Sequence, residues 1–321
     1  MFAKYFLPLL LFISCLECTC KRKGMLDGSW KRADWVVVGN SPVATRAHGI
    51  AVACGGEAYI GLGYDGSNQK DFYRYNPDND TWKKLANFPG EGREGAVAAA
   101  AQGKVFVGLG SGNSGKHNDF YSYDPNRDSW TKIPDFPGEK RSDGVACTLK
   151  WKVLVGLGNG NSGKHNDFYS YDPNRDSWTK IPDFPGIPRL YAIATVVEGR
   201  LYVGLGYDGG HTHFKDFYAY NPDNNTWTRL ADFPEGAIRC SVAFYARRKI
   251  IVGMGWQGGK RSKKFYAYGI DTGKWVEIDE FPAEGRSCAS AFSINQTGYI
   301  VWGRDAPDNT VLKFIPARPA Y

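Results

Sequence analysis

An arginine recurs through the chain at intervals of 47, 48, 48, 50 and 47 residues. Each one begins a similar stretch of sequence, and the six are Arg46, Arg93, Arg141, Arg189, Arg239 and Arg286. A guanidinium group is a rigid, charged fork of donors that suits carboxylates. If the repeated segments bring these arginines to one face, they form a ring that can bind an anionic ligand.

Acidic residues offer a competing role for this ring. Four units carry an aspartate before their third predicted strand, on the same face as the arginine: Asp71, Asp119, Asp167 and Asp216. Pairing within the fold would neutralise those four arginines. The fifth unit has Lys263 and Lys264 at this place and the sixth has no clear equivalent, so Arg239 and Arg286 are predicted to lack partners.

A ligand site is therefore predicted at the fifth and sixth units. Arg239 and Arg286 would be joined there by further positive charge and by an aromatic surface. The added residues are Trp256, Arg261 and Arg304.

Histidines and cysteines are the other reactive side chains. His117 and His165 occupy one position of two near-identical units, His211 and His213 lie in the matching loop of the next unit, and His48 follows Arg46. Because they belong to different units and Gly-rich loops, we predict no metal site and no cofactor. Cys54, Cys147, Cys240 and Cys288 show no CxxC spacing, which favours small residues in inner strands. A Cys240–Cys288 disulfide is disfavoured, because neighbouring inner strands lie too far apart at most heights.

The elements that position these residues follow from the repeat. In the first unit, Arg46 precedes an apolar strand, a second strand ends at 61–63 (Gly-Leu-Gly), a third carries 72–75 (Phe-Tyr-Arg-Tyr), and a fourth starts at Trp82. The second Tyr and the Trp are seven residues apart in all five complete units. The chain also has 39 Gly and 17 Pro, which favour turns. A period of this length with four strands predicts the blade of a β-propeller.

The two ends of the chain are predicted to complete one blade together. The sixth unit stops after residues 311–314 and has no Trp. Segment 29–35, beginning Ser-Trp, parallels segment 227–233 of a complete unit and is predicted as the missing strand. Such closure removes the exposed edges of an open array. The sequence thus predicts an all-β, six-bladed propeller of four-stranded antiparallel blades in one domain, residues 25–321.

The N-terminus is typical of an export signal. Lys4 precedes an apolar run over 6–16 that is too short to span a bilayer. Segment 12–15 stands where a lipobox would lie, so the chain is predicted to be exported, periplasmic or at the cell surface, with residues 1–24 as the signal and Cys15 as a lipid anchor. The alternative is a plain secretory signal cleaved a few residues later.

Charge limits the classes of partner. The net charge of +7 is spread along the chain, and no nucleic-acid-reading motif accompanies it. Nucleic acid is therefore excluded as a partner, and the only expected membrane contact is the N-terminal anchor. The protein is expected to be a monomer.

The period, the Tyr and Trp spacing and the closure resemble the Kelch-repeat family over nearly the whole chain after about residue 28. One departure is the Gly-Leu-Gly after the second strand, where Kelch repeats carry adjacent glycines. The resemblance implies that the face bearing the arginines binds carboxylate-bearing partners. The predicted function is an exported binding module for an anionic ligand, a carbohydrate or a protein.

Two enzyme families share this architecture. The chain is similar in size, export and fold to the N-acetylneuraminate epimerases (sialic acid mutarotases), which implies an arginine for the sugar carboxylate and an acid or base near the ring oxygen. His48, Glu94 and Asp143 follow ring arginines and are candidates, so an epimerase or mutarotase is the alternative function. Galactose oxidase also has a Kelch propeller, but its copper ligand set has no counterpart here, and a copper oxidase is not expected.

Overall fold

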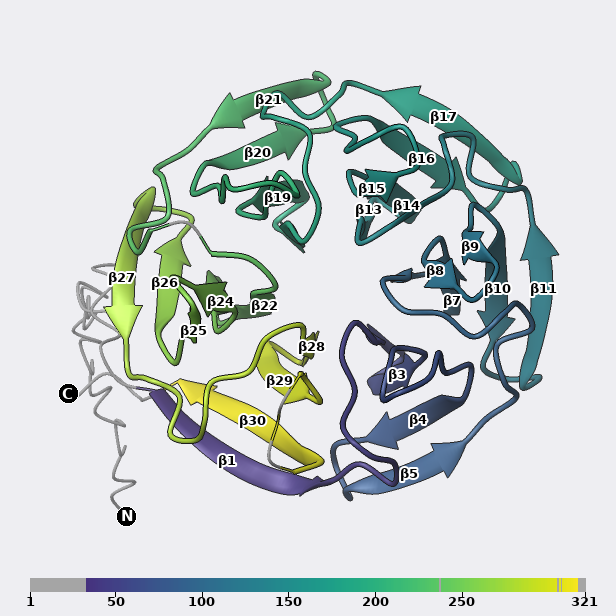
Figure 1. Ribbon diagram of the computed structural model, residues 1–321, viewed down its shortest axis with the longest axis horizontal. Coiled ribbons are helices and arrows are strands. Elements are labelled where there is room, and N and C mark those ends of the chain that lie inside the picture. Colours follow the sequence, from purple (N-terminus) through teal and green to yellow (C-terminus); the bar gives the residue numbers. More distant parts are fainter. Residues whose placement is uncertain (1–32, 237, 305, 307, 317–321) are drawn as a thin grey trace, which may run out of the picture.

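The computed structural model describes residues 33–316, except 237, 305 and 307. Six four-stranded antiparallel sheets stand around a central axis, as Figure 1 shows. This confirms the predicted six-bladed propeller. The predicted signal segment 1–24 lies outside the described residues. No helix in the described part of the chain has the length and apolar character needed to cross a membrane.

The blades follow one another along the chain. Blades one to three consist of β2 (Ile50–Cys54), β3 (Glu57–Gly61), β4 (Phe72–Asn76) and β5 (Thr81–Lys84); β6 (Val97–Ala101), β7 (Lys104–Gly108), β10 (Phe120–Asp124) and β11 (Ser129–Ile133); and β13 (Val145–Leu149), β14 (Lys152–Gly156), β16 (Phe168–Asp172) and β17 (Ser177–Ile181). Blades four to six consist of β18 (Ile193–Val197), β19 (Arg200–Gly204), β20 (Phe217–Asn221) and β21 (Thr226–Arg229); β22 (Val242–Ala246), β23 (Lys249–Gly253), β26 (Phe265–Gly269) and β27 (Lys274–Ile278); and β28 (Ser290–Ile294), β29 (Thr297–Val301), β30 (Thr310–Pro316) and β1 (Ala33–Asn40).

Short two-stranded ladders form within the loops of three blades. They are β8 (Ser111–Gly112) with β9 (Gly115–Lys116), β12 (Arg141–Ser142) with β15 (Asn159–Gly160), and β24 (Trp256–Gln257) with β25 (Lys260–Arg261).

The repeated aromatic residues join neighbouring blades. Trp130 of blade two packs against Phe72 and Phe88 of blade one, at ring-centroid distances of 5.0 and 5.4 Å. Its indole Nε1 also donates a 2.9 Å hydrogen bond to the Ala86 carbonyl of blade one. Burial of large rings with a satisfied indole N–H favours this contact, so Trp130 holds blade two to blade one.

The closing strand is confirmed, but its predicted register is wrong. β1 pairs with β30, and Trp35 lies opposite Phe314. In blade four the equivalent pair is Trp227 and Tyr220, so Trp35 holds the place that the sequence assigned to Trp30. Trp35 contacts Phe265 and Phe281 of blade five. The repeated tryptophans of blades two to five likewise contact the blade before them. Residues 29–32 lie outside the described part of the chain.

The innermost strands line a central channel. Figure 1 shows β22 and β28 near the centre of the ring, with β1 and β27 at its rim. Small residues such as Ala51, Ala98, Ala146 and Ala291 line the channel wall. The loops that lead into the innermost strands therefore meet at one mouth of the channel.

Candidate functional site

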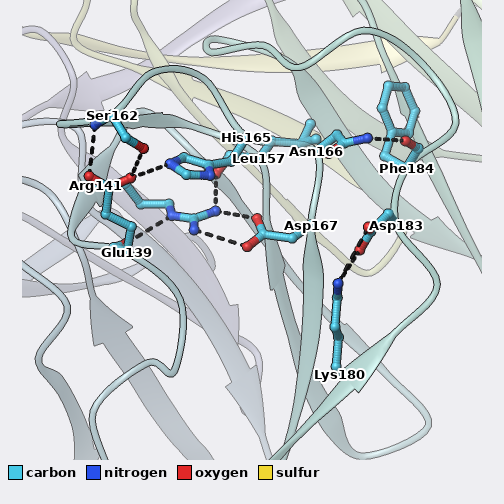
Figure 2. A network of polar contacts seen from close by, with 10 residues as sticks. All are labelled: Glu139, Arg141, Leu157, Ser162, His165, Asn166, Asp167, Lys180, Asp183 and Phe184. Carbon is cyan, nitrogen blue, oxygen red and sulfur yellow. Dashed lines mark hydrogen bonds and ion pairs between the residues drawn. The ribbon is translucent and has the colours of Figure 1, made fainter.

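The predicted arginine ring is largely a buried structural element. Arg46, Arg93, Arg141, Arg189 and Arg286 are at most 3% exposed. Figure 2 shows the arrangement for Arg141, whose Nη1 donates to the Leu157 carbonyl at 3.1 Å and to the Asp167 carboxylate. Its Nη2 donates to the second Asp167 oxygen at 3.0 Å.

The same guanidinium bonds to a carboxylate and to a backbone carbonyl recur in three other blades. The pairs are Arg46–Asp71, Arg93–Asp119 and Arg189–Asp216. The pairing that the sequence offered as the competing role is therefore present in four blades. A buried guanidinium already bonded to a carboxylate is not free to bind a ligand, so direct ligand binding by these arginines has no support in this geometry.

Arg286 also has an acidic partner, contrary to prediction. Its Nη2 lies 3.0 Å from the Asp308 carboxylate and 3.0 Å from the Thr310 hydroxyl. The sequence did not reveal Asp308, because the sixth unit diverges from the repeat before its third strand.

The prediction that Arg239 belongs to this ring is wrong. Each ring arginine donates to a carbonyl sixteen residues later, at Leu62, Leu109, Leu157, Leu205 and Trp302. In blade five the equivalent carbonyl belongs to Met254, which places the buried Ile238 in the ring. Arg239 is the next residue and is only partly buried. The residue before β26 is Lys264, which pairs with Glu235 and Glu277.

Four of the five histidines lie away from the channel mouth. His165 Nε2 lies 2.8 Å from a Glu139 oxygen (Figure 2), and His117 makes the matching contact with Glu91 at 3.1 Å. His213 stacks on Tyr207. Among the residues that the structure describes, no three His, Cys, Asp or Glu side chains are grouped so as to hold a metal ion.

A second ring of residues surrounds the mouth of the channel. Each blade contributes the residue that stands two positions after its ring arginine, or after Ile238 in blade five. All six residues have a left-handed backbone with φ between 53° and 61°. They are His48, Gly95, Asp143, Tyr191, Cys240 and Cys288. Hydrogen bonds join their backbones, including His48 N to Cys288 O at 3.1 Å and Asp143 N to Gly95 O at 2.8 Å. Such a conformation is costly for residues other than glycine, and it concentrates at functional sites.

A cavity of about 330 Å³ opens above this ring. Nine residues from five blades line it: His48, Glu94, Tyr191, Arg239, Cys240, Trp256, Ser287, Cys288 and Arg304. The structure thus brings together Arg239, Trp256 and Arg304 of the predicted site. It also adds Cys240, Cys288, Tyr191 and Ser287, which sequence reasoning missed as site residues.

Two cations and an aromatic ring dominate one side of the cavity. The Arg239 guanidinium lies 4.6 Å from the Tyr207 ring centroid, and its backbone pairs with Trp256. Arg304 is exposed and pairs through its backbone with Ser287. No carboxylate within the described residues forms an ion pair with either guanidinium. Arg261 lies across the β24–β25 ladder from Trp256 and does not line the cavity.

Of the residues that line the cavity, His48 lies beside a carboxylate of the second ring, Asp143. His48 Nδ1 lies 3.7 Å from Asp143 Oδ1, and the Ser142 hydroxyl donates a 2.7 Å hydrogen bond to Asp143 Oδ2. Burial lowers the pKa of His48, but the Cys288 hydrogen bond and the charges of Cys288, Asp143 and Glu94 outweigh it and raise that pKa to about 8. Burial raises the pKa of Asp143 to about 6 despite the charge of His48. His48 is therefore largely cationic at neutral pH.

The two cysteines have opposite shifts. The hydrogen bond with Cys240 lowers the pKa of the Cys288 thiol, and the hydrogen bond and charge of His48 and the charge of Arg304 lower it further against the effect of burial. The hydrogen bond with Cys288 raises the pKa of Cys240, and burial adds to this. Cys288 is thus the more readily ionised thiol, next to an imidazolium.

One spacing in the sequence could have located the mouth residues. Every ring arginine stands sixteen residues before the middle residue of the Gly-x-Gly segment or its equivalent. In blade five, counting sixteen residues back from Met254 gives Ile238 as the ring residue instead of Arg239. The residue two positions later is then the one that faces the channel mouth.

Comparisons with known proteins agree with this architecture. The family model described as the KLHDC2/KLHL20/DRC7 Kelch-repeats domain matches residues 25–189, and the model of N-acetylneuraminate epimerase matches residues 133–256. A solved structure titled "Structure of YjhT" has a TM-score of 0.75 and 18% sequence identity, covering 86% of this chain and 95% of that one. That likeness shows a shared fold. No curated protein matches the chain. Since the Kelch-repeats model spans more than half of its residues, the chain belongs to the Kelch-repeat family.

Proposed function

We propose that the cavity at the channel mouth binds a sugar that bears a carboxylate. The observation that carries this proposal is the pair of guanidinium groups, Arg239 and Arg304, that line one cavity without an ion-pair partner among the described residues. Arginine provides two parallel donors for a carboxylate. Trp256 on the same wall offers an aromatic face on which the apolar side of a sugar ring can pack.

A second candidate is a mutarotase of the N-acetylneuraminate epimerase type. Two observations favour it: the epimerase model matches a segment that contains Asp143, Tyr191, Arg239 and Trp256, and His48 and Glu94 line the same cavity. Ring opening of a sugar acid needs a base that takes the anomeric hydroxyl proton and an acid that protonates the ring oxygen. The Glu94 carboxylate would accept the first proton, and the His48 imidazolium would donate the second. Reclosure on the other face returns both protons.

One experiment separates the two candidates. The probe is N-acetylneuraminate, with N-acetylglucosamine as a neutral control, and NMR follows both binding and the exchange between anomers. Selective binding of the acid without faster exchange supports the binding module, and binding with faster exchange supports the mutarotase. If neither sugar binds while an acidic peptide does, the carbohydrate proposal is wrong and a protein partner takes its place.

Binding of the sugar acid should weaken as the pH rises through about 8. His48 carries a positive charge below this pH, since its pKa is raised to about 8, and loses it above. Loss of one nearby charge in a partly buried site should weaken the binding of a carboxylate by about tenfold. Calorimetric titration between pH 6.5 and pH 9 measures this. In the His48→Gln variant the affinity should not change between pH 6.5 and pH 9. If the affinity of that variant falls with pH as in the wild type, His48 is not the group responsible.

A further inference from the structure

Cys240 and Cys288 lie next to each other although they are 48 residues apart in the sequence. The Cys288 backbone N–H donates a 3.1 Å hydrogen bond to the Cys240 carbonyl. A backbone bond of this kind sets the two Cα atoms roughly 5–6 Å apart, within the range of a disulfide. Both residues are free thiols, partly exposed, and line the cavity. The sequence-based argument against a bridge therefore does not hold at this height of the channel.

The surroundings of Cys288 favour its thiolate. The charges of His48 and Arg304 both favour the ionised form of Cys288, and both residues line the same cavity as this sulfur. The acids near His48 are Asp143, 3.7 Å from its Nδ1, and Glu94, which lines the same cavity. Against the effect of burial, Cys288 itself, Asp143 and Glu94 raise the pKa of His48, so the imidazole is protonated beside the Cys288 thiol. A partly exposed thiolate beside an imidazolium is the usual setting of a reactive cysteine.

The other two described cysteines lack this setting. Cys54 and Cys147 line the channel or its neighbouring core without a charged partner, and burial raises the pKa of Cys147 to about 12. Burial also raises the pKa of Cys54. They serve as internal controls of the same chain.

We propose that Cys240 and Cys288 form a redox-active dithiol that exchanges with low-molecular-weight disulfides. The Cys288 thiolate attacks one sulfur of the external disulfide, forming a mixed disulfide and expelling one thiolate, which takes up a proton. The Cys240 thiol then attacks the Cys288 sulfur and its proton passes to the second leaving thiolate. One external disulfide is reduced by two electrons to two thiols, and one Cys240–Cys288 disulfide forms.

Peptide-resolved labelling of the full chain tests the first step. Trypsin places Cys54, Cys147, Cys240 and Cys288 on separate peptides, 47–70, 142–150, 240–247 and 287–304, and keeps Cys15, Cys18 and Cys20 together on 5–21. Between pH 6 and pH 8, alkylation of an ordinary thiol rises about tenfold per pH unit, whereas that of Cys288 should rise less than about threefold in total. His48→Gln should restore the steep dependence. A Cys288 rate that follows the same slope as Cys54 would overturn the proposal.

Incubation with glutathione disulfide tests the second step. In the wild type, peptides 240–247 and 287–304 should become linked and two hydrogens lighter than their sum. In Cys240→Ser, a glutathione adduct should accumulate on Cys288, and in Cys288→Ser, Cys240 should remain reduced. Cys54→Ser should behave as wild type, and circular dichroism checks that each variant is folded. Absence of the linked pair in folded protein would overturn the proposal. No carbohydrate is used, so the result is independent of the proposed sugar binding.

Discussion

Replacing Arg141 by isoleucine should lower the free energy of unfolding by about 3–5 kcal/mol, because it leaves the Asp167 carboxylate without its buried partner. The side chain of Arg141 is fully buried and that of Asp167 is 19% exposed. The substitution also removes donors from the Leu157 and Glu139 carbonyls. Urea unfolding followed by tryptophan fluorescence measures the change.

A double-mutant cycle makes this prediction specific. Removing both charges with Arg141→Ile and Asp167→Asn should cost at least about 1 kcal/mol less than Arg141→Ile alone, since no uncompensated charge remains. Blade five supports this expectation, because Ile238 replaces the arginine there and no aspartate precedes β26. Arg127→Gln, at a side chain 82% exposed, is the surface control and should change the free energy of unfolding by less than about 0.5 kcal/mol. A double variant no more stable than the single one would contradict the ion-pair explanation.

Replacing Arg239 and Arg304 together by glutamine should weaken the binding of N-acetylneuraminate by about a hundredfold or more. Each charge-assisted hydrogen bond to a carboxylate contributes about 1.5–3 kcal/mol, and both guanidinium groups line the same cavity. Neither is part of the buried Arg–Asp pairs, so the fold should persist. Calorimetric titration of the double variant, with circular dichroism as a check of folding, measures this.

The control for the double variant removes a positive charge at a position far from the cavity, to test for an effect of net charge alone. Arg127→Gln lies in the turn between β10 and β11 and should leave the affinity within about twofold. If the double variant binds the sugar acid as tightly as the wild type, the carboxylate does not lie between these arginines. If Arg127→Gln weakens binding equally, the effect comes from net charge and is unrelated to a site.

The sequence alone determined the blades, because their signals are local and repeated. The 47- to 50-residue period, the seven residues between Tyr and Trp, and the aspartates of four units each depend on contacts within a blade or with its neighbour. These features predicted the propeller, its closure by the N-terminal strand and the Arg–Asp pairs as one of two roles for the ring.

The predictions from the repeat were wrong or incomplete where a unit diverges from the common pattern. Blade five shifts its arginine by one residue and buries Ile238 in the ring position, so pattern matching selected Arg239. The closing strand was aligned on Trp30, whereas the pairing of β1 with β30 selects Trp35. Asp308 lies in a unit with few repeat residues, and its contact with Arg286 was visible only in three dimensions.

The candidate site itself was decided by the tertiary structure. Arg239 stands one residue after the ring position of blade five. The side chain at the ring position is buried in the blade, whereas the side chain of Arg239 lines the mouth cavity. His48 and Cys288 are 240 residues apart, yet closure of the ring makes their backbones hydrogen-bonded neighbours. The blades contribute unequally to the mouth cavity, with three residues each from blades five and six, and a repeat pattern carries no information about which side chains meet there. Those residues also differ from blade to blade, so only the closed ring shows that His48, Glu94, Arg239, Cys288 and Arg304 share one cavity.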